Sequence, residues 1–381
     1  MEFDTLLKLM VEKGASDMFI TAGVPPSMKI HGKIVAVTKA PLSPEKAKEL
    51  TLSVMTEKQR KEFEETLECN FAISARGIGR FRVSAFNQRN LAGMILRRIE
   101  VRIPKIEELN LPPIIKDLAM TKRGLVIFVG ATGAGKSTSL ASMIGHRNRN
   151  SRGHIISIED PIEFIHQHES CIVTQREVGI DTESYEIALK NTLRQAPDVI
   201  MIGEVRSRDT MSYSVAFAET GHLCLATLHA NNANQALDRI AHFFPTEMQR
   251  QLWMDLSLNL KGIVAQQLIP TPDGKGRRAA IEVLINTPLV ADHIRKGEVH
   301  LLKSLMAKSG ESGMQTFDQA LFRLFVDGEI TYEDAIAHAD SSNDLRLMIK
   351  LDQEGGSGEA LNARTKGLTL QGDDGGFENN F

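Results

Sequence analysis

The pattern of apolar and polar positions divides the chain into two parts that differ in the elements they predict. Apolar residues recur at helical spacing over residues 3–10, which predicts a short amphipathic helix. Four short segments then read as strands or as the two arms of a hairpin: 17–20, 28–34, 79–83 and 92–99. Short elements of both kinds predict a small α+β domain over residues 1–100.

The second part begins after a proline-containing segment. Pro104, Pro112 and Pro113 interrupt any regular element, so we expect a linker over residues 101–118. From Gly124 onward apolar strands alternate with helices, which predicts an α/β domain with a doubly wound sheet over residues 119–350, mainly helical after about residue 285. Residues 351–381 are rich in Gly, Asp, Glu and Asn, so we expect a disordered tail.

Composition narrows the class of protein. Aromatic residues make up 5% of the chain against 42% hydrophobic residues, which favours an aliphatic core of the parallel-sheet kind. A formal net charge of -3 gives no long-range attraction to nucleic acid. The acidic, amphipathic start does not resemble a secretion signal, and no apolar run is long enough to span a bilayer. We therefore expect a cytoplasmic protein that binds no nucleic acid.

A glycine-rich loop follows the apolar segment 125–129. Residues 130–137 read GATGAGKS, a full match to GxxxxGK followed by Ser or Thr, placed between a strand and a helix. Backbone amides of such a loop turn toward phosphate oxygens, and the helix adds its positive N-terminus. We expect Lys136 to reach the phosphates of ATP and Ser137 to bind Mg²⁺. The alternative is that the sequence matches the GxxxxGK pattern by chance. The expected nucleotide-binding residues are Gly130, Ala131, Thr132, Gly133, Ala134, Gly135, Lys136, Ser137 and Thr138.

Acidic residues follow two other predicted strands. Segment 155–158 ends in Glu159, Asp160 and Glu163, and segment 199–202 ends in Glu204 after a glycine. Ligands of open parallel sheets lie at the carboxyl ends of strands, so these acids are expected beside the nucleotide, where hydrolysis needs a carboxylate to polarise water. The alternatives are a solvated turn and an ordinary strand end. His229 leaves a fourth strand at the same end; a structural histidine is the alternative to a phosphate sensor.

Several long motifs together resemble a known family. They occur in order at residues 79–88 (GRFRVSAFNQ), 158–164 (IEDPIEF), 196–206 (APDVIMIGEVR), 219–233 (ETGHLCLATLHANNA) and 313–321 (GMQTFDQAL). These segments are similar to motifs of the type IV pilus retraction ATPases, with their PilT and PilU branches, in the type II/IV secretion ATPase superfamily. The resemblance covers residues 1 to about 345.

The resemblance implies a fold, an assembly and roles for individual residues. It implies a PAS-like N-terminal domain before a RecA-like P-loop ATPase domain, assembled as a homo-hexamer. Glu163 would be the catalytic base, Glu204 the acid that helps hold Mg²⁺, and His229 a γ-phosphate sensor. Arginines of the N-terminal domain would complete the site, and the matching residues are Arg80, Arg82 and Arg97, with Arg97 the preferred one.

One departure from the family pattern bears on the protein's role. The retraction motor carries an AIRNLIRE-type helix, whereas residues 289–298 here read LVADHIRKGE. This difference and the long tail favour the PilU branch, and hence an accessory role beside a PilT paralogue. The expected partners are that paralogue and the inner-membrane platform protein of the pilus machine, with this chain at the cytoplasmic face.

Three other functions are compatible with parts of the pattern. A ring-shaped DNA motor could share the RecA-like fold, but the near-neutral charge does not favour it. Secretion or pilus-assembly ATPases of the superfamily generally carry a four-cysteine zinc module, and this chain has three scattered cysteines. A catalytically inactive subunit is disfavoured by the intact set Lys136, Ser137, Glu163 and Glu204. ATP and Mg²⁺ are therefore the expected ligands.

Overall fold

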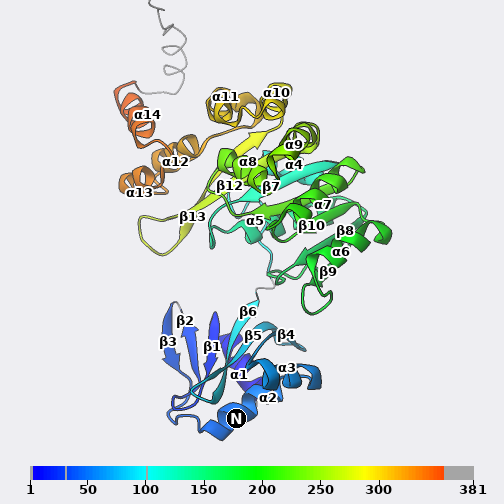
Figure 1. Cartoon of the computed structure of the whole chain (residues 1–381). Coiled ribbons are helices and arrows are strands. Elements are labelled where there is room, and N and C mark those ends of the chain that lie inside the picture. The colour runs from blue at the N-terminus through cyan, green and yellow to red at the C-terminus, as the bar shows by residue number, and fades with distance from the viewer. Residues whose placement is uncertain (1–2, 31, 100–101, 356–381) are drawn as a thin grey trace, which may run out of the picture.

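The computed structural model describes residues 3–30, 32–99 and 102–355, which form two sheets with their helices. Figure 1 shows the N-terminal sheet at the bottom of the view and the larger, helix-covered sheet above it. The last helix, α14 (Ser342–Gly355), includes the first residues of the segment expected to be a disordered tail. The rest of that segment, residues 356–381, lies outside the described residues.

The first sheet has six antiparallel strands in the order β3-β2-β1-β6-β5-β4. Alternate residues of β5 are buried, because successive side chains of a strand point to opposite faces. Helix α1 buries Leu6, Leu7 and Met10 in the same core. The elements are α1 (Phe3–Glu12), β1 (Asp17–Ile20), β2 (Ser27–Ile30), β3 (Lys33–Ala36), α2 (Pro44–Ser53), α3 (Glu57–Thr66), β4 (Glu68–Ala75), β5 (Gly79–Gln88) and β6 (Leu91–Ile99).

The second sheet has seven strands in the order β13-β12-β7-β11-β10-β8-β9. Strands β12, β7, β11, β10, β8 and β9 run parallel, and β13 pairs antiparallel with β12 at one edge. The strands are β7 (Gly124–Val129), β8 (His154–Glu159), β9 (Ile172–Glu177), β10 (Val199–Ile202), β11 (Leu223–Leu228), β12 (Leu260–Pro270) and β13 (Arg277–Ile285).

Helices cover both faces of this sheet (Figure 1). Strand β7 therefore alternates between two cores, with Leu125, Ile127 and Val129 in one and Val126 and Phe128 in the other. Burial on both faces is what an all-apolar strand of a parallel sheet requires. The helices are α4 (Ile114–Met120), α5 (Lys136–Asn150), α6 (Tyr185–Thr192), α7 (Arg208–Glu219), α8 (Ala233–His242), α9 (Thr246–Asn259), α10 (Pro288–Lys296), α11 (Leu302–Lys308), α12 (Phe317–Val326) and α13 (Tyr332–His338).

The segment expected to be a linker packs on the second sheet. Ile106, Leu111, Ile115 and Leu118 are buried in the same core as Phe128. Prolines do interrupt regular structure here, but the apolar residues between them still bury their side chains. In the structure the second domain therefore includes residues from well before position 119.

Within residues 3–355, apart from the undescribed positions 31, 100 and 101, no helix combines the length and the apolar character that crossing a bilayer requires.

The central strand predicts a stability effect. Phe128 lies on β7 and is fully buried. We expect Phe128→Ala to lower the free energy of unfolding by about 3–5 kcal/mol, because it removes buried apolar surface and leaves a cavity. Chemical denaturation followed by circular dichroism measures this change.

The matched control is an exposed apolar residue of the same domain. Leu258, on α9, is 69% exposed, so Leu258→Ala should change the free energy of unfolding by less than about 0.5 kcal/mol. Equal effects of the two substitutions would contradict the assigned core.

Candidate active site

A glycine-rich loop connects β7 to α5 and closes tightly against β12. Gly130 and Gly135 both have positive φ angles, 156° and 85°. A Cβ on Gly130 would lie 2.6 Å from the carbonyl oxygen of Gln266, and one on Gly135 would lie 2.7 Å from its Nε2 atom. Gly130 is required by this close approach to the β12 backbone, and Gly135 by its left-handed backbone conformation, so the sequence sets the shape of the loop.

Lys136 begins α5 and turns back over the loop. Its Nζ atom donates hydrogen bonds to the carbonyl oxygens of Gly130 and Ala131, at 2.7 and 3.0 Å. Burial lowers the pKa of Lys136, and the negative charge of Glu204 opposes that shift. A buried ammonium group at the N-terminus of a 15-residue helix forms a strongly anion-attracting position.

The carboxyl ends of the neighbouring strands β11, β10 and β8 deliver further side chains to this loop. A cavity of about 400 Å³ brings them together. Besides residues of the loop, its lining includes Arg82, Glu159, Asp160, Glu163, Glu204, Arg206, Thr227 and His229. The structure thus places Lys136, Ser137, Glu163, Glu204 and His229, all expected from the sequence, around one space.

Glu204 is held from both sides. Its Oε1 atom lies 3.1 Å from Nε2 of His229, and its Oε2 atom accepts hydrogen bonds from Arg206 at 2.7 and 2.8 Å. Arg206 also lies 3.7 Å from a carboxylate oxygen of Asp160. These contacts fix the orientation of the Glu204 carboxylate and link it to the acidic segment that follows β8.

The two glutamates of that segment differ in their surroundings. Glu159 is buried; it accepts hydrogen bonds from Ser157 at 2.6 Å and Gln175 at 3.1 Å, and burial raises its pKa. Glu163 is exposed and borders the cavity. Both glutamates line the cavity, and Glu163 has the more accessible carboxylate.

Arginines of the N-terminal domain take three different positions. Arg82 lines the cavity with Lys136. Arg97 borders an adjoining space, which Arg82 and Lys136 also line, but its Nε atom pairs with Asp17 at 2.8 Å. Arg80 instead forms an ion pair with Glu177 of β9 at 2.9 Å.

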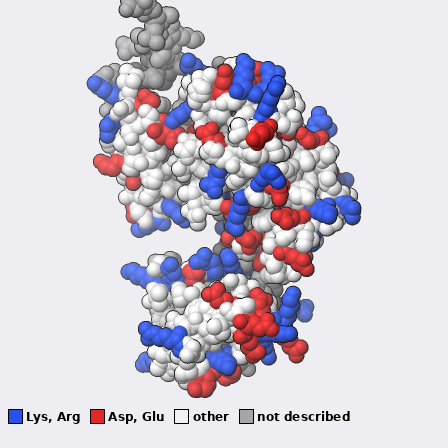
Figure 2. All heavy atoms as spheres, viewed as in Figure 1, with Lys and Arg blue, Asp and Glu red and all other residues white. Residues whose placement is uncertain are grey.

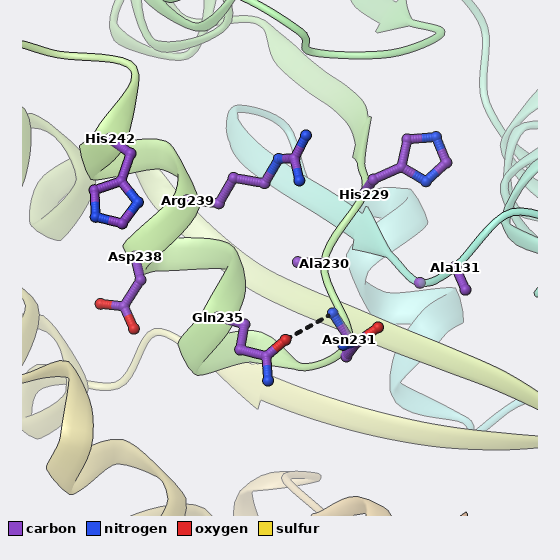
Figure 3. A pocket seen from close by; sticks show the side chains of 9 residues that line it. Ala131, His229, Ala230, Asn231, Gln235, Asp238, Arg239 and His242 are labelled. Carbon is purple, nitrogen blue, oxygen red and sulfur yellow. Dashed lines mark hydrogen bonds between the residues drawn. The ribbon is translucent and has the colours of Figure 1, made fainter.

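A groove beside the loop is formed by the residues after β11 and by α8 (Figure 3). Arg239 extends from α8 toward His229, and the amide of Asn231 donates to the side chain of Gln235 at 3.3 Å. His222, at the other end of β11, bonds locally to Thr220 and Phe217.

Sequence reasoning did not single out Arg206, Gln266 or Arg239. Arg206 could have been predicted as a site residue, because it follows Glu204 by two positions in the sequence. Gln266 and Arg239 are brought to the loop only by the fold.

The oxygen atoms around the cavity suit a hard divalent cation. Ser137, Asp160 and Glu204 offer oxygen ligands of the kind that Mg²⁺ prefers. Across the described ranges, no group of three or more His, Cys, Asp or Glu side chains could hold a metal ion unaided. An ion here would draw most of its ligands from phosphate oxygens and water, as Mg²⁺ commonly does.

Comparison with known proteins agrees with this geometry. The family model described as type II/IV secretion system protein matches residues 3–316. The type IV pilus ATPase PilU of Pseudomonas aeruginosa is 75% identical over 371 residues, which are 97% of each chain. The type IV pilus retraction ATPase PilT of the same organism is 40% identical over 335 residues, covering 88% of this chain and 97% of that protein.

Solved structures show the same fold. A crystal structure of the pilus retraction motor PilT with bound ADP superposes with a TM-score of 0.86 at 41% identity, covering 91% of this chain and 99% of that one. The ATPase DotB of Legionella pneumophila gives a TM-score of 0.73 at 27% identity, covering 88% and 95%. The α/β, RecA-like fold predicted from the sequence is confirmed. The chain belongs to the type II/IV secretion ATPases, in the PilT/PilU group of type IV pilus ATPases.

Proposed function

We propose that this chain hydrolyses ATP at the Lys136 cavity and couples hydrolysis to type IV pilus retraction. The observation that carries the proposal is the shared cavity: Lys136, Glu163, Glu204 and His229 border one space of about 400 Å³. Phosphoryl transfer is catalysed almost entirely by positioning and by electrostatic stabilisation. A loop that binds phosphate, opposed by carboxylates on neighbouring strands, meets both needs.

The phosphate loop provides binding. Residues 130–138 hold the triphosphate with backbone amides, and the ammonium group of Lys136 exchanges its two carbonyl acceptors for phosphate oxygens. Ser137 and Glu204 would hold Mg²⁺, Glu204 partly through water. When bound, the ion neutralises charge on the phosphates and favours attack.

Glu163 is the proposed catalytic base. It is exposed to the cavity, whereas Glu159 is buried and committed to Ser157 and Gln175. The carboxylate of Glu163 orients a water molecule toward the γ-phosphate. His229 bonds Glu204 and borders the loop, which suits a residue that responds to the γ-phosphate.

Positive charge from the N-terminal domain completes the site. Figure 2 shows Lys and Arg side chains gathered along the edge of that domain that faces the ATPase domain. Arg82 borders both spaces that Lys136 lines, whereas Arg97 borders only one of them and is paired with Asp17. Arg82 is therefore the arginine best placed to stabilise the transition state in this arrangement. Arg97 remains the alternative, and would first have to leave Asp17.

The working assembly is a homo-hexameric ring at the cytoplasmic face of the inner membrane. There, closure of the N-terminal domain on ATP and its release after hydrolysis would act on the pilus platform protein. An accessory role beside a PilT paralogue is supported by the 75% identity to PilU, against 40% to PilT, and by the divergent segment 289–298.

Two substitutions separate binding from chemistry. We expect Glu163→Gln to bind ATP with near-normal affinity and to lower kcat by at least about 100-fold, because the base is lost. We expect Lys136→Ala to weaken nucleotide binding itself. Phosphate release and binding of a fluorescent ATP analogue measure the two effects, and normal turnover by Glu163→Gln would refute its assignment.

The two cavity-facing arginines give a direct comparison. Arg82→Ala should lower kcat more than Arg97→Ala, because Arg82 borders the Lys136 cavity while Arg97 is paired with Asp17. A loss of 10³-fold or more is typical of a charge that acts in the transition state. The reverse order in steady-state kinetics would assign the role to Arg97.

The cellular role is tested by genetics in the source organism. We expect deletion of this gene to impair twitching and pilus retraction. A strain with a chromosomal Lys136→Ala allele is compared with the deletion strain. Restoring retraction by overproducing this chain in a strain lacking the PilT paralogue would contradict the accessory role. Normal twitching in the deletion strain would contradict the proposed function.

A further inference from the structure

One ion pair joins the two domains close to the proposed base. Arg80, on β5 of the N-terminal domain, donates from Nη2 to Oε2 of Glu177 at 2.9 Å. Glu177 ends β9 of the ATPase domain, and its side chain is only 5% exposed. The two residues are 97 positions apart, so the fold alone brings them together.

The same carboxylate oxygen also holds the acidic segment after β8. Oε2 of Glu177 accepts a hydrogen bond from the amide of Ile162 at 3.3 Å, one residue before Glu163. A backbone hydrogen bond joins the same two segments, because the amide of Val178 donates to the carbonyl of Glu159 at 2.9 Å. Glu177 therefore connects an arginine of one domain to the backbone that carries the base of the other.

Arg80 and Arg82 have separate tasks. They are two residues apart on β5 and so share a face of the strand. Arg82 borders the Lys136 cavity, while Arg80 is engaged by Glu177. Because Arg80 is paired with Glu177, it is not available to bind the phosphates in this arrangement.

Burial makes the pair sensitive to domain position. Burial raises the pKa of Glu177, whereas the Ile162 amide and Arg80 oppose that shift by favouring the charged form. If Arg80 withdrew with its domain, Glu177 would lose the cation that favours its charged form.

We propose that Arg80 is a positioning residue that, through Glu177 and the Ile162 amide, sets the position of Glu163 according to whether the N-terminal domain is docked. The proposal rests on the proposed function, since it concerns the same base. It gives the chain a physical link between domain closure and hydrolysis that is separate from any arginine contact to phosphate.

The test measures kcat, KM and ADP affinity separately on the full-length protein. We expect Arg80→Ala and Glu177→Gln each to lower kcat by about ten-fold, with affinity for a fluorescent ADP changed less than about two-fold. The double variant should be no slower than the slower single one, because both remove one link. Arg80→Lys should restore part of kcat, since it keeps the charge.

Arg295→Ala is the matched control, because Arg295 forms an exposed ion pair with Asp292 on α10, away from the cavity. It should keep wild-type kcat. Each of three results would overturn the proposal. The first is a wild-type kcat in Arg80→Ala, and the second is additive losses of kcat in the double variant. The third is a loss of nucleotide affinity in Arg80→Ala while Glu177→Gln keeps wild-type kinetics. If Glu177→Gln does not fold, the Arg80→Ala and Arg80→Lys pair decides. A wild-type protein without ATPase activity would instead refute the proposed function.

Discussion

Four adjacent parallel strands, in the order β7-β11-β10-β8, end at one edge of the sheet, and the whole site depends on this constraint. Because parallel strands share a carboxyl edge, the phosphate loop, His229, Glu204 and the acidic segment before Glu163 must converge there. Apolar side chains buried on both faces fix the register of the strands. The chemistry is thus positioned by the core, and the polar residues need only occupy the strand ends.

Ion pairs hold the side chains at this edge of the sheet in place and join the edge to the N-terminal domain. Glu204 is held by His229 and Arg206, and Arg206 reaches Asp160. At the other side of the same segment, Glu177 joins Ile162 to Arg80 of the N-terminal domain. The acidic segment is therefore bounded by two arginines from different parts of the fold, so a movement of either domain changes the surroundings of the proposed base.

Local patterns sufficed for the parts of the site that lie at strand ends. The glycine spacing and the acids after apolar runs could be predicted, because each is encoded within a few residues. The Arg80 and Glu177 contact could not, since it joins residues 97 positions apart. The segment expected as a linker shows another limit: prolines marked the breaks correctly, but the burial of Ile106 and Leu111 depends on the surface that the second sheet offers.

The most direct measurement is a structure of the full-length protein with Mg²⁺ and a non-hydrolysable ATP analogue. We expect Lys136 to be released from the carbonyls of Gly130 and Ala131 and bound to phosphate oxygens. We also expect a magnesium ion beside Ser137 and Glu204, with the Glu163 carboxylate facing the γ-phosphate through water. A nucleotide bound elsewhere, or Glu163 and Glu204 turned away from the phosphates with no space for the ion, would refute the proposed site.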